Sequence, residues 1–143
     1  MNAAARTLVS RLCYNAAMPI FYLEPRDGQT SHPRWGATSL SEACWVVARN
    51  SYRARLKVGM ATLKEGCFVT APKNWPDQPA HEQKLYSAWL NAHLTDCRPD
   101  NPPAEIPDGM IITVTGQSIA SDETVDDPNW KPRRPGGFST TRL

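Results

Sequence analysis

The fold depends on the stretch CWVVARNSYRARL, residues 44–56, which two patterns interpret differently. Ser39 followed by Glu42 is a capping box that would start one long helix through the whole stretch. Residues 44–48, however, are β-branched and aromatic, as is typical of a strand. Asn50-Ser51 then offers a better placed helix cap. We therefore predict a strand over residues 44–48, followed by a helix that begins near Ser51.

Two neighbouring faces are expected on this helix. The first is an apolar seam that faces the core, made of Tyr52, Leu56, Gly59, Met60 and Leu63. The second is basic, because Arg53, Lys57 and Lys64 fall within about 40° of one another on the helical wheel. We predict that these three cations are exposed and could bind a phosphate backbone or an acidic protein surface. A solvated helix face is the simpler alternative.

Further elements complete an α+β domain. Residues 20–23 and 110–115 are expected to be strands, with Pro19 and Pro25 favouring an edge position or a short strand for the first. Residues 67–70 are a weaker strand candidate. Pro79 can begin a second helix that ends before Pro99, with one broad face of Leu85, Tyr86, Trp89, Leu90, Ala92 and His93. We predict a small mixed or antiparallel sheet with two helices and proline-rich loops.

The 143 residues fit a single domain with distinct ends. Residues 1–17 are interpreted as an N-terminal extension, with a mitochondrial transit segment as the alternative, since they contain Arg6 and Arg11 but no acid. Residues 18–118 form the predicted domain. Residues 119–143 are predicted to be a proline-rich, flexible and irregular C-terminal arm, because they contain few aliphatic residues.

The C-terminal arm also contains candidate binding residues. Trp130 is followed by Arg133 and Arg134, and aromatic side chains with arginine dominate binding hot spots. We predict that Trp130, Arg133 and Arg134 anchor a partner. The acidic cluster of residues 122–127 is expected to be a solvated charge run.

Composition excludes several classes of protein. A net charge of +2 provides no global field for nucleic acid or an anionic membrane. No run approaches the roughly 18 apolar residues that span a bilayer, so we expect a soluble protein without a membrane partner. The four cysteines are widely spaced, without a CxxC pair or a secretory signal. Reduced thiols and a cytoplasmic location are therefore expected.

Candidate catalytic and metal-binding sets are incomplete. His93 and Cys97 have the i, i+4 spacing of two ligands on one helix face, but a core histidine and a buried thiol explain them more simply. Cys67 or Cys97 with His81 or His93 could form a nucleophilic pair, yet no cysteine-enzyme signature surrounds them. There is no Walker loop and no GxGxxG motif. We predict no metal, no cofactor and no enzymatic activity.

One arrangement of motifs resembles a known kind of protein. Phe21-Tyr22-Leu23 is followed by Pro33-x-Trp35, by CWVVA at residues 44–48 and by Ala54-Arg55. Over residues 18–65 this order resembles small uncharacterised bacterial proteins, a domain of unknown function with a strand, loop, strand and helix. The resemblance implies a strand at residues 44–48 and a bacterial origin, and it implies no activity.

The functional hypothesis follows from the incomplete catalytic sets. We expect a non-enzymatic protein-interaction or regulatory module whose partner is a protein, including a second copy of itself in a homo-oligomer. The first alternative is a weak nucleic-acid-binding protein that uses Arg53, Lys57 and Lys64. The second alternative is a Cys/His enzyme.

Two tryptophans lie beside prolines in predicted loops. Trp35 and Trp75 are expected to cover the core.

Overall fold

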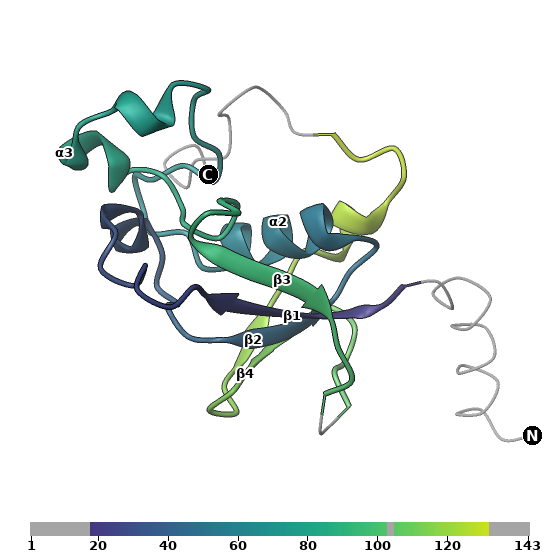
Figure 1. Ribbon diagram of the computed structural model, residues 1–143. Coiled ribbons are helices and arrows are strands. Elements are labelled where there is room, and N and C mark those ends of the chain that lie inside the picture. Colours follow the sequence, from purple (N-terminus) through teal and green to yellow (C-terminus); the bar gives the residue numbers. More distant parts are fainter. Residues whose placement is uncertain (1–17, 103–104, 132–143) are drawn as a thin grey trace, which may run out of the picture.

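A computed structural model describes residues 18–102 and 105–131 of the chain (Figure 1). These residues form one five-stranded antiparallel sheet with helices, as the predicted α+β class requires. The strand order is β3-β1-β2-β4-β5. The strand bounds are Ile20–Pro25 for β1, Cys44–Val47 for β2, Thr95–Pro99 for β3, Met110–Thr113 for β4 and Ser118–Ala120 for β5.

The strand at residues 44–48 and the helix after it are confirmed. The helix α2 is Ser51–Ala61, and the side chain of Asn50 caps it by accepting the backbone N–H of Arg53 at 2.9 Å. A short helix α3 is Ala80–Gln83. Three 3-10 turns complete the described elements: η1 at Pro33–Ala37, η2 at Trp75–Asp77 and η3 at Glu123–Asp126.

The predicted long helix between Pro79 and Pro99 is wrong. Only Ala80–Gln83 is helical, and Thr95–Pro99 is strand β3, paired with β1 over five residue pairs. The side chain of Asn91 accepts the backbone N–H of His93 at 2.7 Å. This local bond stabilises a turn in place of a helix. Pairing with β1 then stabilises the extended conformation of Thr95–Pro99.

Two strand expectations also need correction. Residues 67–70 form no strand, since Phe68 contributes an isolated bridge to Tyr86. The strand β1 is central rather than at an edge, because it pairs with β2 on one side and with β3 on the other. Its prolines are tolerated because Pro25 ends the strand and Pro19 precedes it, so no interior N–H is lost.

The main core lies between α2 and the sheet. Leu23, Val46 and Ile111 project from the sheet and are fully buried with Trp89. The ring of Trp35 meets that of Trp89 edge to face, with centroids 5.1 Å apart, so its expected role as a cover of the core is confirmed. The side chain of Trp75 lies outside the description of the structure.

A second apolar cluster lies on the opposite side of α2. Leu56 and Val69 are buried there against Val125, and Trp130 packs on the same cluster. The helix is therefore covered on two sides, by the sheet and by the segment around η3. Leu56 and Gly59 of the predicted seam are buried, as expected. Tyr52 of the same seam is 49% exposed, whereas Lys57, which was expected to be exposed, is buried.

The predicted domain boundary at residue 118 is wrong. Ser118–Ala120 is strand β5, and Val125 is completely buried. The acidic residues of this region are not all solvated, because Asp126 forms an ion pair with the buried Lys57. The domain extends at least to residue 131, and the remainder of the predicted arm, residues 132–143, lies outside the described part of the chain.

Candidate functional site

The two faces of the sheet differ in what covers them. Alternate side chains point to opposite faces of a strand. Phe21, Leu23 and Val46 point toward α2 and are buried. Tyr22 and Trp45 point away from α2 and are only partly buried. In Figure 1, α2 lies along one side of the sheet, and the opposite side, which α2 does not cover, is here named the open face.

Antiparallel pairing aligns one row of side chains across the open face. The register matches Tyr22 with Arg98 on one side and with Trp45 on the other. Trp45 is matched in turn with Ile112. The rings of Tyr22 and Trp45 have centroids 5.2 Å apart, and the guanidinium carbon of Arg98 lies 4.9 Å from the centre of the Tyr22 ring. The open face therefore carries a continuous aromatic and aliphatic surface.

Ion pairs and hydrogen bonds surround this surface at the β3 side. Arg98 pairs with Glu24 at 2.9 Å, and Arg26 pairs with Asp96 at 3.1 Å. The indole N–H of Trp45 donates to the carboxylate of Asp100 at 3.0 Å. The rim thus holds two cations and three acids.

Tyr22 is held in its neutral form. Burial raises the pKa of Tyr22, and the negative charge of Glu24 raises that pKa further. A phenol is already neutral at pH 7 with its usual pKa of about 10, and the raised pKa keeps the hydroxyl protonated in more alkaline solution as well. This arrangement can bind an apolar surface that brings both signs of charge, whereas its three acids oppose a phosphate backbone.

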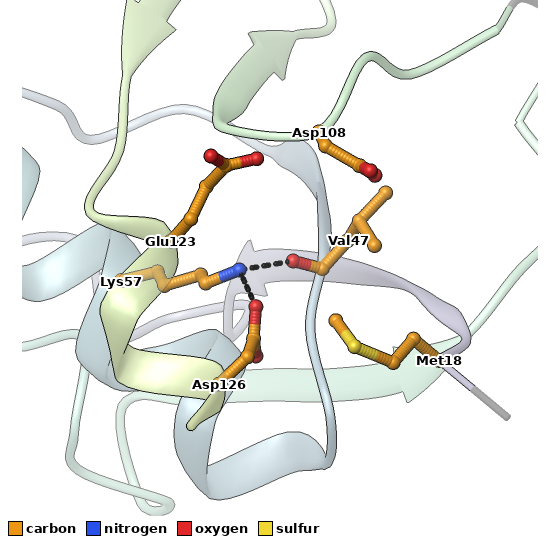
Figure 2. Close-up of a pocket in the computed structure, with 6 residues that line it drawn as sticks. All are labelled: Met18, Val47, Lys57, Asp108, Glu123 and Asp126. Atoms are coloured by element: carbon orange, nitrogen blue, oxygen red, sulfur yellow. Dashed lines mark hydrogen bonds and ion pairs between the residues drawn. The ribbon is translucent and has the colours of Figure 1, made fainter. Parts of the chain in front are cut away.

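The basic face predicted on the helix does not form. Lys57 is 1% exposed, and its ammonium donates to the carbonyl oxygen of Val47 at 2.7 Å and pairs with the carboxylate of Asp126. Figure 2 shows both interactions. The expected exposure of Lys57 is wrong, because η3 covers this side of α2.

Arg53 and Trp130 are brought together inside the domain. The guanidinium of Arg53 donates to the carbonyl oxygen of Val125 at 3.0 Å and lies 5.1 Å from the centre of the Trp130 ring. Trp130 itself packs on the second apolar cluster. These contacts attach the C-terminal segment to α2. Arg53 and Trp130 therefore bind to each other within the domain, whereas the sequence predicted that they bind a partner.

The remaining predicted binding residues are Lys64, Arg133 and Arg134. Lys64 is exposed and lies three residues beyond the end of α2. Arg133 and Arg134 lie outside the described residues. Their predicted roles in binding stay predictions.

A small polar cavity adjoins Lys57. Its volume is about 100 Å³, and Figure 2 shows the side chains that line it: Met18, Val47, Lys57, Asp108, Glu123 and Asp126. Ligand pockets are typically larger than about 300 Å³. Within the described part of the chain, no three His, Cys, Asp or Glu side chains come together as a metal site. The cavity is suited to water rather than to an organic ligand.

The described thiols are poor nucleophiles. Burial raises the pKa of Cys44 to about 12 and that of Cys97 to about 11, and it also raises the pKa of Cys67. Cys44 and Cys97 both pair with Leu23, from opposite sides, so about two strand spacings of roughly 4.8 Å separate their Cα atoms. That separation exceeds the limit of about 7 Å for a disulfide.

His93 is exposed in a turn, contrary to its expected core position.

We expect the native protein to react slowly with iodoacetamide at Cys44 and Cys97 at pH 8. Their raised pKa values leave little thiolate, and the thiolate is the reactive form. Timed alkylation followed by peptide mapping measures the rate at each cysteine. In urea the same cysteines should react at least about tenfold faster. Equal rates in the native and unfolded protein would contradict the burial of these thiols.

Comparison with known proteins gives no match to a family model, to a curated protein or to a solved structure. The resemblance of residues 18–65 to small bacterial proteins therefore stays a prediction. None of the helices described here is both long and apolar enough to cross a bilayer.

The open face was missed at the sequence level, although a signal for it exists. Tyr22 and Trp45 occupy alternate positions within apolar runs, next to Phe21, Leu23 and Val46. A strand that is apolar on both faces needs a cover on each. The antiparallel register that aligns Tyr22 with Trp45 depends on the tertiary pairing.

Proposed function

We propose that this protein is a non-enzymatic protein-interaction module whose open sheet face binds a second copy of the chain. The observation that carries the proposal is the row of Tyr22, Trp45 and Ile112 on a face that α2 does not cover. Aromatic side chains with a neighbouring arginine, here Arg98, are the composition of interface centres. Face-to-face packing of two sheets, about 10 Å apart, is a common way to bury such a row.

The charges at the rim support a partner identical to this chain. Arg26 and Arg98 lie beside Glu24, Asp96 and Asp100, so the rim has a formal charge of only −1 and repels a second copy little. In an isologous contact residue i of one copy meets residue j of the other and the reverse, so a two-fold axis can pair the cations of each rim with the acids of the other. Nucleic acid is less well matched, because its backbone needs a net positive surface.

The dimensions of the face predict a weak complex. Five strands at about 4.8 Å spacing extend about 19 Å, and a strand of six residues is about 20 Å long, which together cover roughly 400 Å². A standard stable interface buries about 800 Å² on each partner. We therefore expect a dimer with a Kd on the order of 0.1–1 mM, which dissociates on dilution.

Ile112→Glu is expected to abolish this dimer. Each copy would bring one new carboxylate into the apolar row, and burying it unpaired opposes association. Sedimentation equilibrium between about 10 μM and 1 mM measures the effect: the wild-type mass should rise with concentration, and the variant should remain monomeric.

Tyr52→Glu is the matched control for this experiment. It introduces the same charge at an exposed position of α2, in the other layer of the fold, and should dimerise like the wild type. A wild type that stays monomeric at 1 mM, or a control that also loses dimerisation, overturns the proposal. So does a single-stranded oligonucleotide whose binding is lost in Ile112→Glu but kept in Tyr52→Glu.

A cytoplasmic location belongs to the same proposal. Cys44, Cys67 and Cys97 are all free thiols, and Cys44 and Cys97 are too far apart to bridge. Reducing compartments maintain such thiols.

A further inference from the structure

A second cavity lies away from the open face, between η1 and two irregular segments. Its volume is about 290 Å³, and it is lined by Arg34 of η1, by residues 70–71 and by residues 90–93. None of these residues belongs to the row of Tyr22, Trp45 and Ile112. This volume is at the lower end of the usual range for ligand pockets, so the cavity can hold only a small molecule of several heavy atoms, whereas the cavity beside Lys57 is about three times smaller.

The cationic wall of this cavity is fixed in place. Arg34 is 2% exposed, and its guanidinium donates to the carbonyl oxygen of Ser87 at 2.8 Å and to that of Tyr86 at 3.4 Å. These bonds orient a planar group whose geometry suits carboxylates. Burial lowers the pKa of Arg34 to about 10, so the side chain remains charged at neutral pH.

The other polar lining groups also suit an anion. Among the described residues that line the cavity none is acidic, and Asn91 and His93 are polar. The hydroxyl oxygen of Thr70 is buried and has no hydrogen-bond partner among the described residues. A buried hydroxyl without a partner costs about 1–3 kcal/mol, and a ligand that supplies an acceptor offsets this cost.

The rest of the lining is apolar and selects among anions. Ala71, Leu90 and Ala92 contribute aliphatic surface to the same cavity. Inorganic phosphate would gain nothing from that surface, whereas a short hydrocarbon chain would. We propose that this cavity binds a small carboxylate with a short aliphatic chain, with the carboxylate toward Arg34 and Thr70 and the chain against Leu90.

The test is a titration of the full-length ¹⁵N-labelled protein with butyrate at constant ionic strength. Saturable amide shifts are expected at residues 70–71 and 90–93, with a Kd on the order of 1–10 mM for so small a ligand. Butylamine has a similar chain but the opposite charge, and it should cause no saturable shift there. Phosphate should bind at least about tenfold more weakly than butyrate, because it makes no apolar contact.

Two variants keep the proposal falsifiable without relying on Arg34, whose removal could disturb the fold. Ala92→Leu adds volume at an exposed rim position of the cavity and should weaken butyrate binding at least about tenfold. Ala120→Leu makes the same change at an exposed position of β5 and should bind butyrate like the wild type.

Thr70→Val, which replaces the hydroxyl with a methyl group, should weaken butyrate binding about threefold to tenfold. Butylamine binding equal to that of butyrate, or unchanged butyrate binding in Ala92→Leu, overturns the proposal. Butyrate binding is read at residues 70–71 and 90–93, which are outside the row of Tyr22, Trp45 and Ile112, so it is tested separately from the proposed dimer.

Discussion

Asp126→Ala is expected to lower the free energy of unfolding by about 3 kcal/mol, because it leaves the ammonium of Lys57 buried without its carboxylate. Lys57 is fully buried, and the same carboxylate of Asp126 also accepts the backbone N–H of Arg49 at 2.9 Å. Removing one member of a buried ion pair costs more than the pair contributes, since the remaining charge keeps its desolvation penalty. Urea denaturation followed by tryptophan fluorescence measures the loss.

The control is Asp127→Ala, the same substitution at the next residue. Asp127 is exposed, and its carboxylate accepts only a local hydrogen bond from Asn129 among the described contacts. Its loss should cost less than about 1 kcal/mol. The double variant Lys57→Met with Asp126→Ala should recover part of the loss, because no buried charge remains. Equal stability of Asp126→Ala and Asp127→Ala would contradict the buried pair.

Deletion of residues 121–143 is expected to unfold the domain. The deletion exposes Leu56 and Val69, which Val125 and Trp130 cover, and it removes the carboxylate that pairs with Lys57. Burial of one large apolar side chain contributes about 1.5–3 kcal/mol, and the unpaired lysine costs about 3–5 kcal/mol more. The sum approaches the whole stability of a small domain, about 5–15 kcal/mol.

Circular dichroism and thermal unfolding compare this truncated chain with one that ends at Lys131. The longer chain keeps every contact of Val125, Asp126 and Trp130 named above and should melt cooperatively. The shorter chain should show no cooperative transition. If the chain without residues 121–143 melts near the temperature of the full-length protein, the result would contradict this expectation and support the flexible arm that composition alone predicts.

The buried thiols add a pH dependence to this stability. In the unfolded chain the thiols have a usual pKa of 9.0, and in the folded protein burial raises the pKa of Cys44 to about 12 and that of Cys97 to about 11. Between these values the unfolded chain binds fewer protons than the folded one, so stability falls as pH rises. Their contribution is fully present below about pH 9 and is lost as the pH rises through 11–12.

Local sequence determined the elements whose signals are confined to a few adjacent residues. The runs at residues 20–23, 44–48 and 110–115 all contain strands, because β-branched and aromatic side chains favour extended backbone. The helix begins at Ser51 because Asn50 supplies a cap within its first turn. The α+β class followed from these elements together, and so did the placement of Trp35 in the core.

Tertiary structure alone decided the features that depend on distant partners. Thr95–Pro99 became a strand because β1 offers a backbone edge to pair with, which outweighs the local helical pattern. Helical spacing alone assigns Lys57 to a solvated face, yet Asp126, 69 residues away, allows it to be buried. The open face likewise exists because the register aligns Tyr22 with Trp45 and α2 covers only the opposite side. Propensity and periodicity act over one or two turns of chain, whereas pairing and burial are set by residues that meet only in the folded state.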